Sequence, residues 1–244
     1  MMRAILTYHS IDRSGSAISV SPETFRAHVE WLAASGVRVV SVPELLALPD
    51  DANALALTFD DALASVATEA APLLAAHALP ATVFVVTQHV GGDNRWGGVG
   101  DPGIAVQPVL GWDALAKLRG QGFTIGAHSR RHPHLTRCSD AELGDELAGS
   151  ADDIVAALGE RPTAFAYPYG SIDDRVLQAA REHFAVGCTT EFRVVTPGVA
   201  AEAVPRLDAW YFQKPSALSR WGTGGFRRSV LLRHAMRRAR RMFR

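Results

Sequence analysis

Residues 55–61 read Leu-Ala-Leu-Thr-Phe-Asp-Asp, an almost entirely apolar run that ends in two adjacent carboxylates. Such a run predicts a strand covered on both faces, and the alanine-rich stretch at 62–76 predicts a helix directly after it. A buried strand followed by a helix is the repeating unit of α/β folds. In those folds the carboxyl ends of the strands carry the chemistry, so the two acidic residues stand where a functional site is expected.

The same strand–helix unit recurs along most of the chain. Short apolar runs predict further strands at 4–8, 37–40, 81–86, 123–127, 163–167 and 185–189. Helical patterns lie between them, at 21–36, 42–48, 112–119, 139–158 and 172–183. This alternation predicts parallel strands joined by right-handed crossovers. Because no Gly-rich nucleotide loop is present, about seven such strands favour an α/β fold of the distorted, TIM-like (β/α)-barrel type over an open sheet.

The composition excludes several classes of protein. The length of 244 residues suits one large domain or two small ones, and 48% hydrophobic residues are ample for a core. These proportions exclude disordered, collagen-like and disulfide-stapled chains. Cys138 and Cys188 are the only cysteines, so they form neither a disulfide framework nor a cysteine zinc cluster. Without a run of roughly 20 apolar residues or a signal-peptide core, we expect a soluble cytoplasmic protein.

The two acidic residues at the end of the 55–59 strand allow two interpretations. Adjacent carboxylates repel one another unless a positive charge separates their roles. One interpretation is that Asp61 caps a helix beginning at Ala62 while Asp60 is merely exposed. The other is that one carboxylate binds a cation and its neighbour acts as a base.

Two histidines follow the predicted strand at 123–127. His128 and His132 are four residues apart, a spacing that can direct two imidazoles to one point. Two histidines and one carboxylate leave open positions on a divalent metal ion, as a hydrolytic site requires. The alternative is a surface turn rich in histidine and arginine, and the nearby His134 shows that not every histidine here can be a ligand.

Two further polar clusters also follow predicted strands. His9 ends the first strand, and Pro168-Tyr169-Gly170 ends the strand at 163–167. Because parallel strands end at the same rim of a barrel, we expect these residues to lie beside the acids and histidines.

Taken in order, these motifs point to a known family. Thr58-Phe59-Asp60-Asp61, then His128-Ser129-x-x-His132-Pro133, then Tyr167-Pro168-Tyr169-Gly170 resemble the polysaccharide deacetylase family, the NodB-homology group or carbohydrate esterase family 4. The likeness covers roughly residues 4–190, and the opening Tyr8-His9-Ser10-Ile11 is similar to a large branch of the family. It implies a hydrolase that removes acetyl groups from N- or O-acetylated sugars in a polysaccharide, oligosaccharide or lipid-linked precursor.

The resemblance implies a role for each matching polar side chain. Asp60 would be the general base. Asp61, His128 and His132 would be the ligands of a divalent metal ion, most often zinc. The ion would lower the pKa of water toward ~7 and so provide a nucleophile at neutral pH.

The resemblance also implies how substrate is held. The backbone N–H of Tyr169 would stabilise the oxyanion, and Pro168 would fix the orientation of that peptide.

Trp96 lies in the glycine-dense loop at 91–111, and a loop of that length is more often functional than idle. We expect Trp96 to stack on the apolar face of a sugar ring.

The sequence departs from the family in the arginine that orients the base. Many members carry it two residues before the proline of the third motif, where this chain has Ala166. We expect Arg206 to replace it, from a late strand. The alternative for Arg206 is an ordinary structural ion pair with Asp208.

The general acid is also open. In the family it is commonly a histidine near the end of the domain, but no histidine lies between His183 and His234, and His234 belongs to the basic tail. We expect His9 to be the acid, with a structural histidine at the edge of the core as the alternative. His28 and His77, like His183, fall on predicted helices or at their ends, where we expect them to face solvent.

The zero net charge conceals a strongly basic tail. Residues 225–244 contain eight arginines and no acid, which leaves 17 basic against 25 acidic groups in residues 1–224. The tail predicts an amphipathic helix. Its apolar stripe consists of Leu232, Ala235, Met236, Ala239, Met242 and Phe243.

We expect a catalytic domain at 1–212 and a basic amphipathic segment at 213–244. The helix in that segment is expected to contact an anionic membrane at its inner surface through residues 225–244, and nucleic acid is not the expected partner. The alternative is a helix that caps the domain and offsets its acidic charge.

Two other functions remain open from the sequence. Relatives of this barrel hydrolyse non-sugar amides, so the same site can serve a different substrate. A degenerate barrel that binds sugar without catalysis is the non-enzymatic alternative. Retention of all four metal-site residues argues against a scaffold, whereas the displaced arginine and missing acid histidine argue for it.

Overall fold

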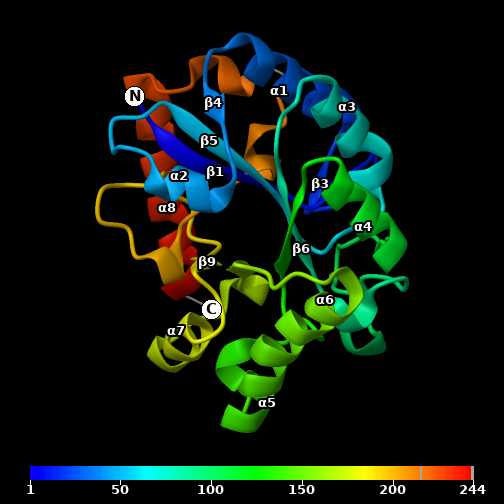
Figure 1. Ribbon diagram of the computed structural model, residues 1–244. Helices are drawn as coiled ribbons and strands as arrows, with labels where there is room; N and C mark the ends of the chain where they lie inside the picture. The colour runs from blue at the N-terminus through cyan, green and yellow to red at the C-terminus, as the bar shows by residue number, and fades with distance from the viewer. Residues whose placement is uncertain (215, 243–244) are drawn as a thin grey trace.

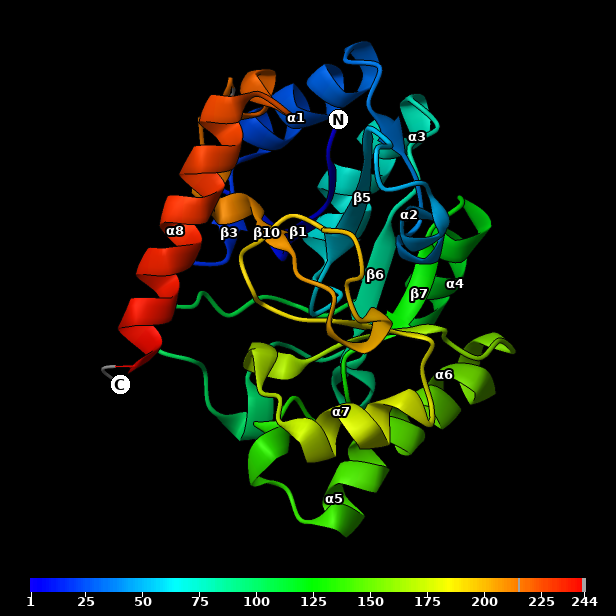
Figure 2. The same ribbon diagram turned by 90° about the vertical axis from the view of Figure 1, so that its left-hand side faces the viewer.

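A curled sheet of parallel strands forms the centre of the molecule (Figures 1 and 2). The computed structural model describes residues 1–214 and 216–242, and side chains as far as residue 239. The strand order is β10 (Leu207–Asp208), β1 (Arg3–Tyr8), β5 (Ala54–Phe59), β6 (Thr82–Val85), β7 (Thr124–Ala127), β8 (Ala164–Ala166) and β9 (Val186–Cys188). The short β4 (Arg38–Val39) also pairs with β5, and β2 (Ser10–Ile11) and β3 (Ser19–Val20) form a separate pair.

Helices surround this sheet (Figure 1). They are α1 (Pro22–Ala34), α2 (Val42–Ala47), α3 (Ala71–Ala76), α4 (Trp112–Gly120), α5 (Asp140–Gly144), α6 (Ser150–Leu158), α7 (Asp174–Arg181) and α8 (Gly224–Met242). The π-helix η5 (Asp145–Gly149) joins α5 to α6, so the helix predicted at 139–158 is present as one continuous segment. It begins at Ser139, whose side chain accepts from the backbone N–H of Glu142 in a capping box.

An irregular link brings the two ends of the curled sheet together. The N–H of Val204 donates to Gly187 at 2.7 Å, and the N–H of Thr189 donates to Val204 at 2.8 Å. β10 begins three residues later and pairs with β1. Because this closure is short and irregular, the barrel is distorted, as the sequence predicts.

Both faces of the strands are buried, which explains their nearly continuous apolar sequences. Along β1, Leu6 belongs to the large cluster between sheet and helices, whereas its neighbour Ile5 belongs to the smaller cluster inside the barrel. Both side chains are fully buried. Burial of one such side chain stabilises the fold by about 1.5–3 kcal/mol.

The helix after β5 begins later than predicted. Asp61 and Ala62 have φ angles of 70° and 50°, which no α-helix contains. The carbonyl of Ala62 accepts from Leu110, and the N–H of Ala64 donates to Pro108, so this turn pairs with the 91–111 loop. The helical segment therefore starts only at η1 (Val66–Ala70). The interpretation that Asp61 caps a helix beginning at Ala62 is wrong.

Helix α8 packs along one side of the barrel (Figure 2). Phe226 and Val230 are buried, and the Phe226 ring stacks on Phe212 with centroids 5.7 Å apart. The predicted apolar stripe lies on another face, where Leu232 and Met236 are 66% and 52% exposed. The side chain of Met242, and Phe243 altogether, fall outside the described residues.

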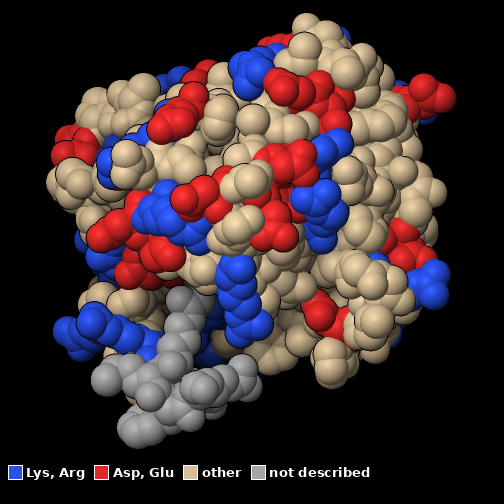
Figure 3. Space-filling model, turned by 90° about the horizontal axis from the view of Figure 1, so that it is seen from below, with Lys and Arg blue, Asp and Glu red and all other residues tan. Residues whose placement is uncertain are grey.

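The face that includes α5 carries both signs of charge (Figure 3). Ion pairs there include Arg131 with Asp145, at 2.6 Å, and Arg175 with Asp140, at 2.9 Å. Acidic and basic side chains alternate on it rather than forming one positive field. Within the described chain, no helix combines the length and apolar character that crossing a bilayer requires.

Candidate active site

Asp60, at the carboxyl end of β5, is held by Arg206 from the segment that leads into β10. The Nη1 and Nη2 atoms of Arg206 each lie 2.7 Å from a carboxylate oxygen of Asp60. The guanidinium also donates to Thr7 Oγ1 at 2.8 Å and to the carbonyl of Thr189 at 3.0 Å. Burial favours the neutral carboxyl, but the Arg206 charge outweighs it and holds the pKa of Asp60 below its usual range. Asp60 is therefore a carboxylate at neutral pH.

Asp61, His128 and His132 converge on one buried point. Asp61 Oδ1 lies 3.5 Å from the Nε2 atom of each histidine, and the two Nε2 atoms lie 3.2 Å apart. All three side chains are at least nine-tenths buried. No described residue gives Asp61 Oδ1 a hydrogen bond.

The chemistry of these donors fits a divalent metal ion. The Nδ1–H of His128 donates to the carbonyl of Ala166 at 2.6 Å, so its Nε2 presents a lone pair toward Asp61. Burial raises the pKa of Asp61, and burial together with His128 holds the pKa of His132 well below its usual value. When neither Nε2 atom carries a proton, the carboxylate oxygen and the two nitrogen lone pairs face one another and repel unless a cation lies between them. One oxygen and two nitrogen ligands suit zinc and leave positions open.

Glu146, in the π-helix η5, holds the backbone of the histidine loop, a role that the sequence did not predict. Its side chain is 2% exposed, and its Oε2 accepts the backbone N–H of Arg130 at 2.8 Å and that of Arg131 at 2.9 Å. Its Oε1 accepts Nε of Arg131 at 2.7 Å. The N–H of His132 donates to Ser129 Oγ at 3.0 Å within the same loop. The sequence offered one sign of this role: Glu146 is an acidic residue on the inner face of the helix predicted at 139–158.

Aromatic rings form the open side of the metal-ligand cluster. The ring of Trp96 lies 4.8 Å from that of His132, and the ring of Tyr169 lies 4.5 Å from it. These rings line a cleft of about 600 Å³. The Tyr169 hydroxyl donates to Asp101 of the 91–111 loop at 3.2 Å. The predicted sugar-stacking residue thus lies beside the predicted metal ligands.

The turn after β8 has little conformational freedom. Pro168 is buried, and Tyr169 has a φ of 58°, in the left-handed region. Gly170 follows with a φ of 65°, and a Cβ atom there would lie 2.0 Å from Thr190 Oγ1. Only glycine fits at position 170, so this turn fixes the direction of the Tyr169 peptide.

Left-handed backbone is concentrated in these motif turns. Among the described residues, six that are not glycine have a positive φ. Five of them follow the strands that carry the site: Asp61, Ala62, Ser129, His132 and Tyr169. Such conformations are unfavourable for residues with a Cβ atom and persist where the surroundings enforce them.

The structure also places the remaining candidate residues. His9 Nε2 lies 3.8 Å from Asp60 Oδ2, and His9 is partly exposed, so it stands at the site. His234 faces Glu191 instead, with Nε2 3.8 Å from its carboxylate. Asp208 lies 3.8 Å from Arg237, whereas Arg206 pairs with Asp60.

Comparison with known proteins decides the family. The sequence model of the polysaccharide deacetylase family matches residues 47–185, more than half of the chain. The chain belongs to the polysaccharide deacetylase family. The match contains all three motifs from Thr58 to Gly170, so the predicted family is confirmed.

This deacetylase-family chain is similar to bacterial relatives. The Bacillus subtilis protein YxkH, which is named as a polysaccharide deacetylase, is 26% identical over 203 residues. The alignment covers 81% of this chain and 66% of YxkH. The poly-beta-1,6-N-acetyl-D-glucosamine N-deacetylase of Staphylococcus epidermidis is 22% identical, covering 78% and 67%. The chain thus spans about two thirds of the length of these relatives.

Solved structures of deacetylases share the fold. The Streptococcus pyogenes deacetylase PplD, in complex with acetate, aligns with a TM-score of 0.74 and 23% identity, over 90% of this chain and 97% of its own. IcaB from Ammonifex degensii aligns with a TM-score of 0.73 and 22% identity, over 89% and 97%. The predicted distorted barrel of parallel strands is confirmed.

Proposed function

We propose that this chain is a metal-dependent hydrolase that removes N-acetyl groups from amino sugars of a polysaccharide. The observation that carries the proposal is the buried Asp61 Oδ1, which lies 3.5 Å from two imidazole nitrogens and has no hydrogen bond from any described residue. The name of the Staphylococcus epidermidis relative supports the N-acetyl substrate. Asp61, His128 and His132 hold the ion, and zinc is the metal we propose.

The remaining residues have separate tasks in this proposal. A divalent ion bound by the three ligands supplies the Lewis acidity that activates water at neutral pH. Asp60, kept ionised by Arg206, accepts a proton from the attacking water as the oxygen adds to the amide carbonyl. The backbone N–H of Tyr169 donates to the oxyanion that forms. His9 gives its proton to the leaving nitrogen as the C–N bond breaks, and the products are acetate and an amine.

Substrate binding falls to the open cleft. Trp96 offers a ring face for a pyranose beside His132, and Pro168 keeps the Tyr169 peptide directed at the reacting carbonyl. Hydrolysis of O-acetyl esters requires the same groups. A non-sugar amide is the second candidate substrate, and a scaffold that binds sugar without catalysis is the non-enzymatic one.

We also propose that residues 225–244 contact an anionic membrane surface from the cytoplasmic side. The exposed Leu232 and Met236 lie on a helix rich in arginine, as interfacial helices do. The packing of α8 on the barrel equally suits a helix that caps the domain. A truncation at residue 222 that binds anionic vesicles as the full chain does would contradict the membrane contact.

Acetate release tests the enzymatic proposal. The zinc-loaded protein should release acetate from oligomers of β-1,6-linked N-acetylglucosamine, and chito-oligosaccharides and small amides define the specificity. Asp60→Asn should still bind zinc, and its kcat should fall about 10²-fold. Asp61→Ala should lose both zinc binding and turnover. Glu160→Gln, on the surface, is the matched control.

Three outcomes would contradict parts of the proposal. Absence of a stoichiometric divalent ion would favour the scaffold. Turnover of small amides alone would favour the non-sugar substrate. An unchanged rate in Asp60→Asn would remove that residue from the role of base.

A further inference from the structure

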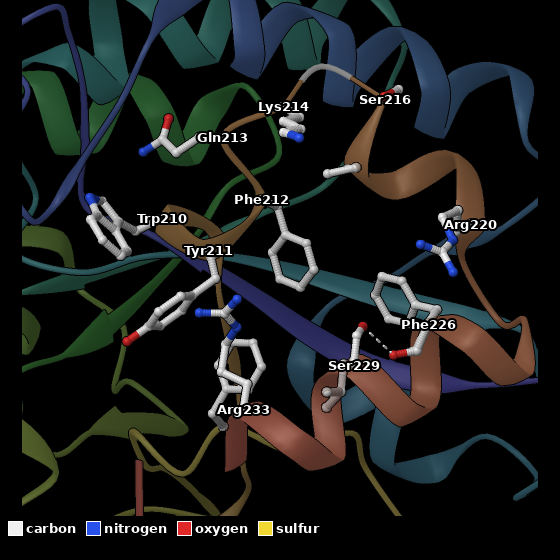
Figure 4. A pocket seen from close by; sticks show the side chains of 13 residues that line it. Trp210, Tyr211, Phe212, Gln213, Lys214, Ser216, Arg220, Phe226, Ser229 and Arg233 are labelled. Atoms are coloured by element: carbon white, nitrogen blue, oxygen red, sulfur yellow. Dashed lines mark hydrogen bonds between the residues drawn. The ribbon is translucent and has the colours of Figure 1, made fainter. Parts of the chain in front are cut away.

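A second cavity lies apart from the metal-ligand cluster, between α8 and the 3-10 helices η8 (Ala209–Phe212) and η9 (Ala217–Arg220) (Figure 4). Its volume is about 530 Å³. This is within the usual range for small-molecule sites, about 300–1,000 Å³. Nothing in the proposed deacetylation uses this cavity.

Aromatic rings form the walls of the cavity. The ring of Phe212 stacks on Phe226 with centroids 5.7 Å apart and on Phe192 with centroids 6.1 Å apart. Tyr211 meets the edge of Phe192 at 5.1 Å, and Trp210, which is 39% exposed, continues the wall to the surface. These walls suit an apolar chain, because they offer continuous ring surface.

Three cations surround this apolar wall. They are Lys214, Arg220 and Arg233, and no acidic residue stands among the described side chains that line the cavity. None of the three forms an ion pair within the described part of the chain. The guanidinium of Arg233 lies 4.3 Å from the centre of the Tyr211 ring, so it stands at the boundary between the apolar wall and the positive charges.

The charge of the cavity selects between two kinds of occupant. Three positive side chains repel a cationic ligand such as an amine. A phosphate, by contrast, matches arginine in charge and in hydrogen-bonding geometry. The cavity therefore fits a ligand with an apolar chain and an anionic head group.

Exposed apolar side chains continue the lining outside the cavity. Ser229 and Arg233 line it from α8, and Leu232 and Met236 follow three residues after each of them. Residues three apart are neighbours on a helix surface, so both lie next to the edge of the cavity. Leu232 is 66% exposed and Met236 is 52% exposed. A lipid chain leaving the cavity would meet these apolar side chains first.

We propose that this cavity binds the apolar chain of a phosphate-bearing lipid, with Arg233, Arg220 and Lys214 holding the phosphate. The proposal depends neither on the deacetylase activity nor on the membrane contact proposed above. It adds a ligand site to the barrel at the position where α8 packs on it.

Binding of dodecyl phosphate, below the concentration at which it forms micelles, tests the site by titration calorimetry. We expect one equivalent to bind, no measurable binding of inorganic phosphate, and weak binding of the uncharged dodecyl maltoside. Arg233→Gln should weaken binding about tenfold through loss of a charge-assisted hydrogen bond. Arg228→Gln is the matched control, because it removes the same charge from an exposed position of α8 outside the cavity.

A cavity-filling variant separates the site from general charge effects. Ala217→Phe keeps every cation and should abolish binding of the chain, with zinc binding and circular dichroism unchanged. Lys214→Gln repeats the charge test if Arg233→Gln does not fold. No binding of monomeric dodecyl phosphate would overturn the proposal, as would equal losses in Arg233→Gln and Arg228→Gln.

Vesicles containing phosphatidylglycerol distinguish the two sources of such a lipid. If the wild type and Arg228→Gln float with these vesicles and Arg233→Gln does not, the ligand is a lipid of the bilayer. Binding of the monomer without flotation identifies a free lipid phosphate and contradicts the membrane contact while supporting the site. Inorganic phosphate that binds as tightly as dodecyl phosphate would overturn the role of the apolar wall.

Discussion

Arg206 and Asp60 form a two-pronged ion pair in the interior, with both N–O distances at 2.7 Å, although 146 residues separate them in the sequence. Both side chains are at most 4% exposed. A buried carboxylate of this kind stays ionised only because its partner is fixed in place. The pair thus links the stability of the barrel to the protonation state of the proposed base.

Loss of Arg206 should therefore affect both stability and turnover. Arg206→Met leaves Asp60 buried and unpaired, which should lower the free energy of unfolding by roughly 3–5 kcal/mol. Arg206→Lys keeps the charge but not the paired geometry, so it should be more stable than Arg206→Met yet still lose turnover. Denaturant unfolding and acetate release measure the two effects. Equal stability of wild type and Arg206→Met would contradict the structural role of the pair.

Glu146 should determine how tightly the metal ion is held. Glu146→Gln loses the charge that accepts two backbone N–H groups of the histidine loop, and we expect metal affinity to fall about 10–100-fold. Competition with a zinc chelator measures this directly, without an activity assay. Asp152→Asn, an exposed acid nearby on α6, is the control and should bind zinc as the wild type does. A full-affinity Glu146→Gln variant would show that the loop holds its shape without this carboxylate.

Trp96 should contribute to substrate binding more than to the chemical step. Trp96→Ala removes the ring beside His132, and KM should rise about tenfold with little change in kcat, if the contact is the same in ground and transition states. Trp96→Phe retains a ring face and should recover most of the affinity. A loss confined to kcat would place Trp96 in support of His132 instead.

His28 should make stability depend on pH. It is fully buried, its Nδ1 accepts from the Tyr8 hydroxyl at 2.9 Å, and its Nε2–H donates to the carbonyl of Phe212 at 3.0 Å. Burial lowers the pKa of His28 to about 4, below its ordinary value near 6.5. The unfolded chain therefore binds the proton more tightly, so this stabilisation is complete above pH ~6.5 and is lost as the pH falls toward 4.

The measurement is denaturant unfolding between pH 7.5 and pH ~4.5. His28→Gln cannot titrate, so its free energy of unfolding should fall less with decreasing pH than that of the wild type. Parallel pH curves for the two proteins would assign the dependence to other groups. His77 is exposed, and His77→Gln should follow the wild-type curve.

The sequence predicted the site better than it predicted the backbone that shapes it. The apolar run ending in Asp60 and Asp61 predicted that these acids lie at the same rim as His128 and His132, because parallel strands end together. Their roles came from the ordered set of motifs and stay predictions. His28 was predicted to face solvent and is buried, since the pattern of one helix does not reveal that Tyr8 and Phe212 pack over it. Such contacts depend on segments far apart in the sequence.

The predicted start of the helix after β5 was wrong for a related reason. Local propensity in the alanine-rich stretch favours a helix from Ala62, but the 91–111 loop takes the backbone groups of that turn. The role of Arg206 stays a prediction, although the structure pairs it with Asp60. The division of the chain at residue 212 also stays a prediction. Helix α8 packs closely on the barrel, so this helix does not form a separate body.

The left-handed residues in the motif turns have a consequence for protein engineering. Each departs from the conformation its side chain prefers, by roughly 1–2 kcal/mol. Glycine at those positions would relieve the backbone, but at Asp61 and His132 it would also delete the groups proposed to do the chemistry. A library selected only for survival of heating should therefore accumulate changes around these turns and yield robust but inactive proteins. Activity has to be part of the selection from the first round.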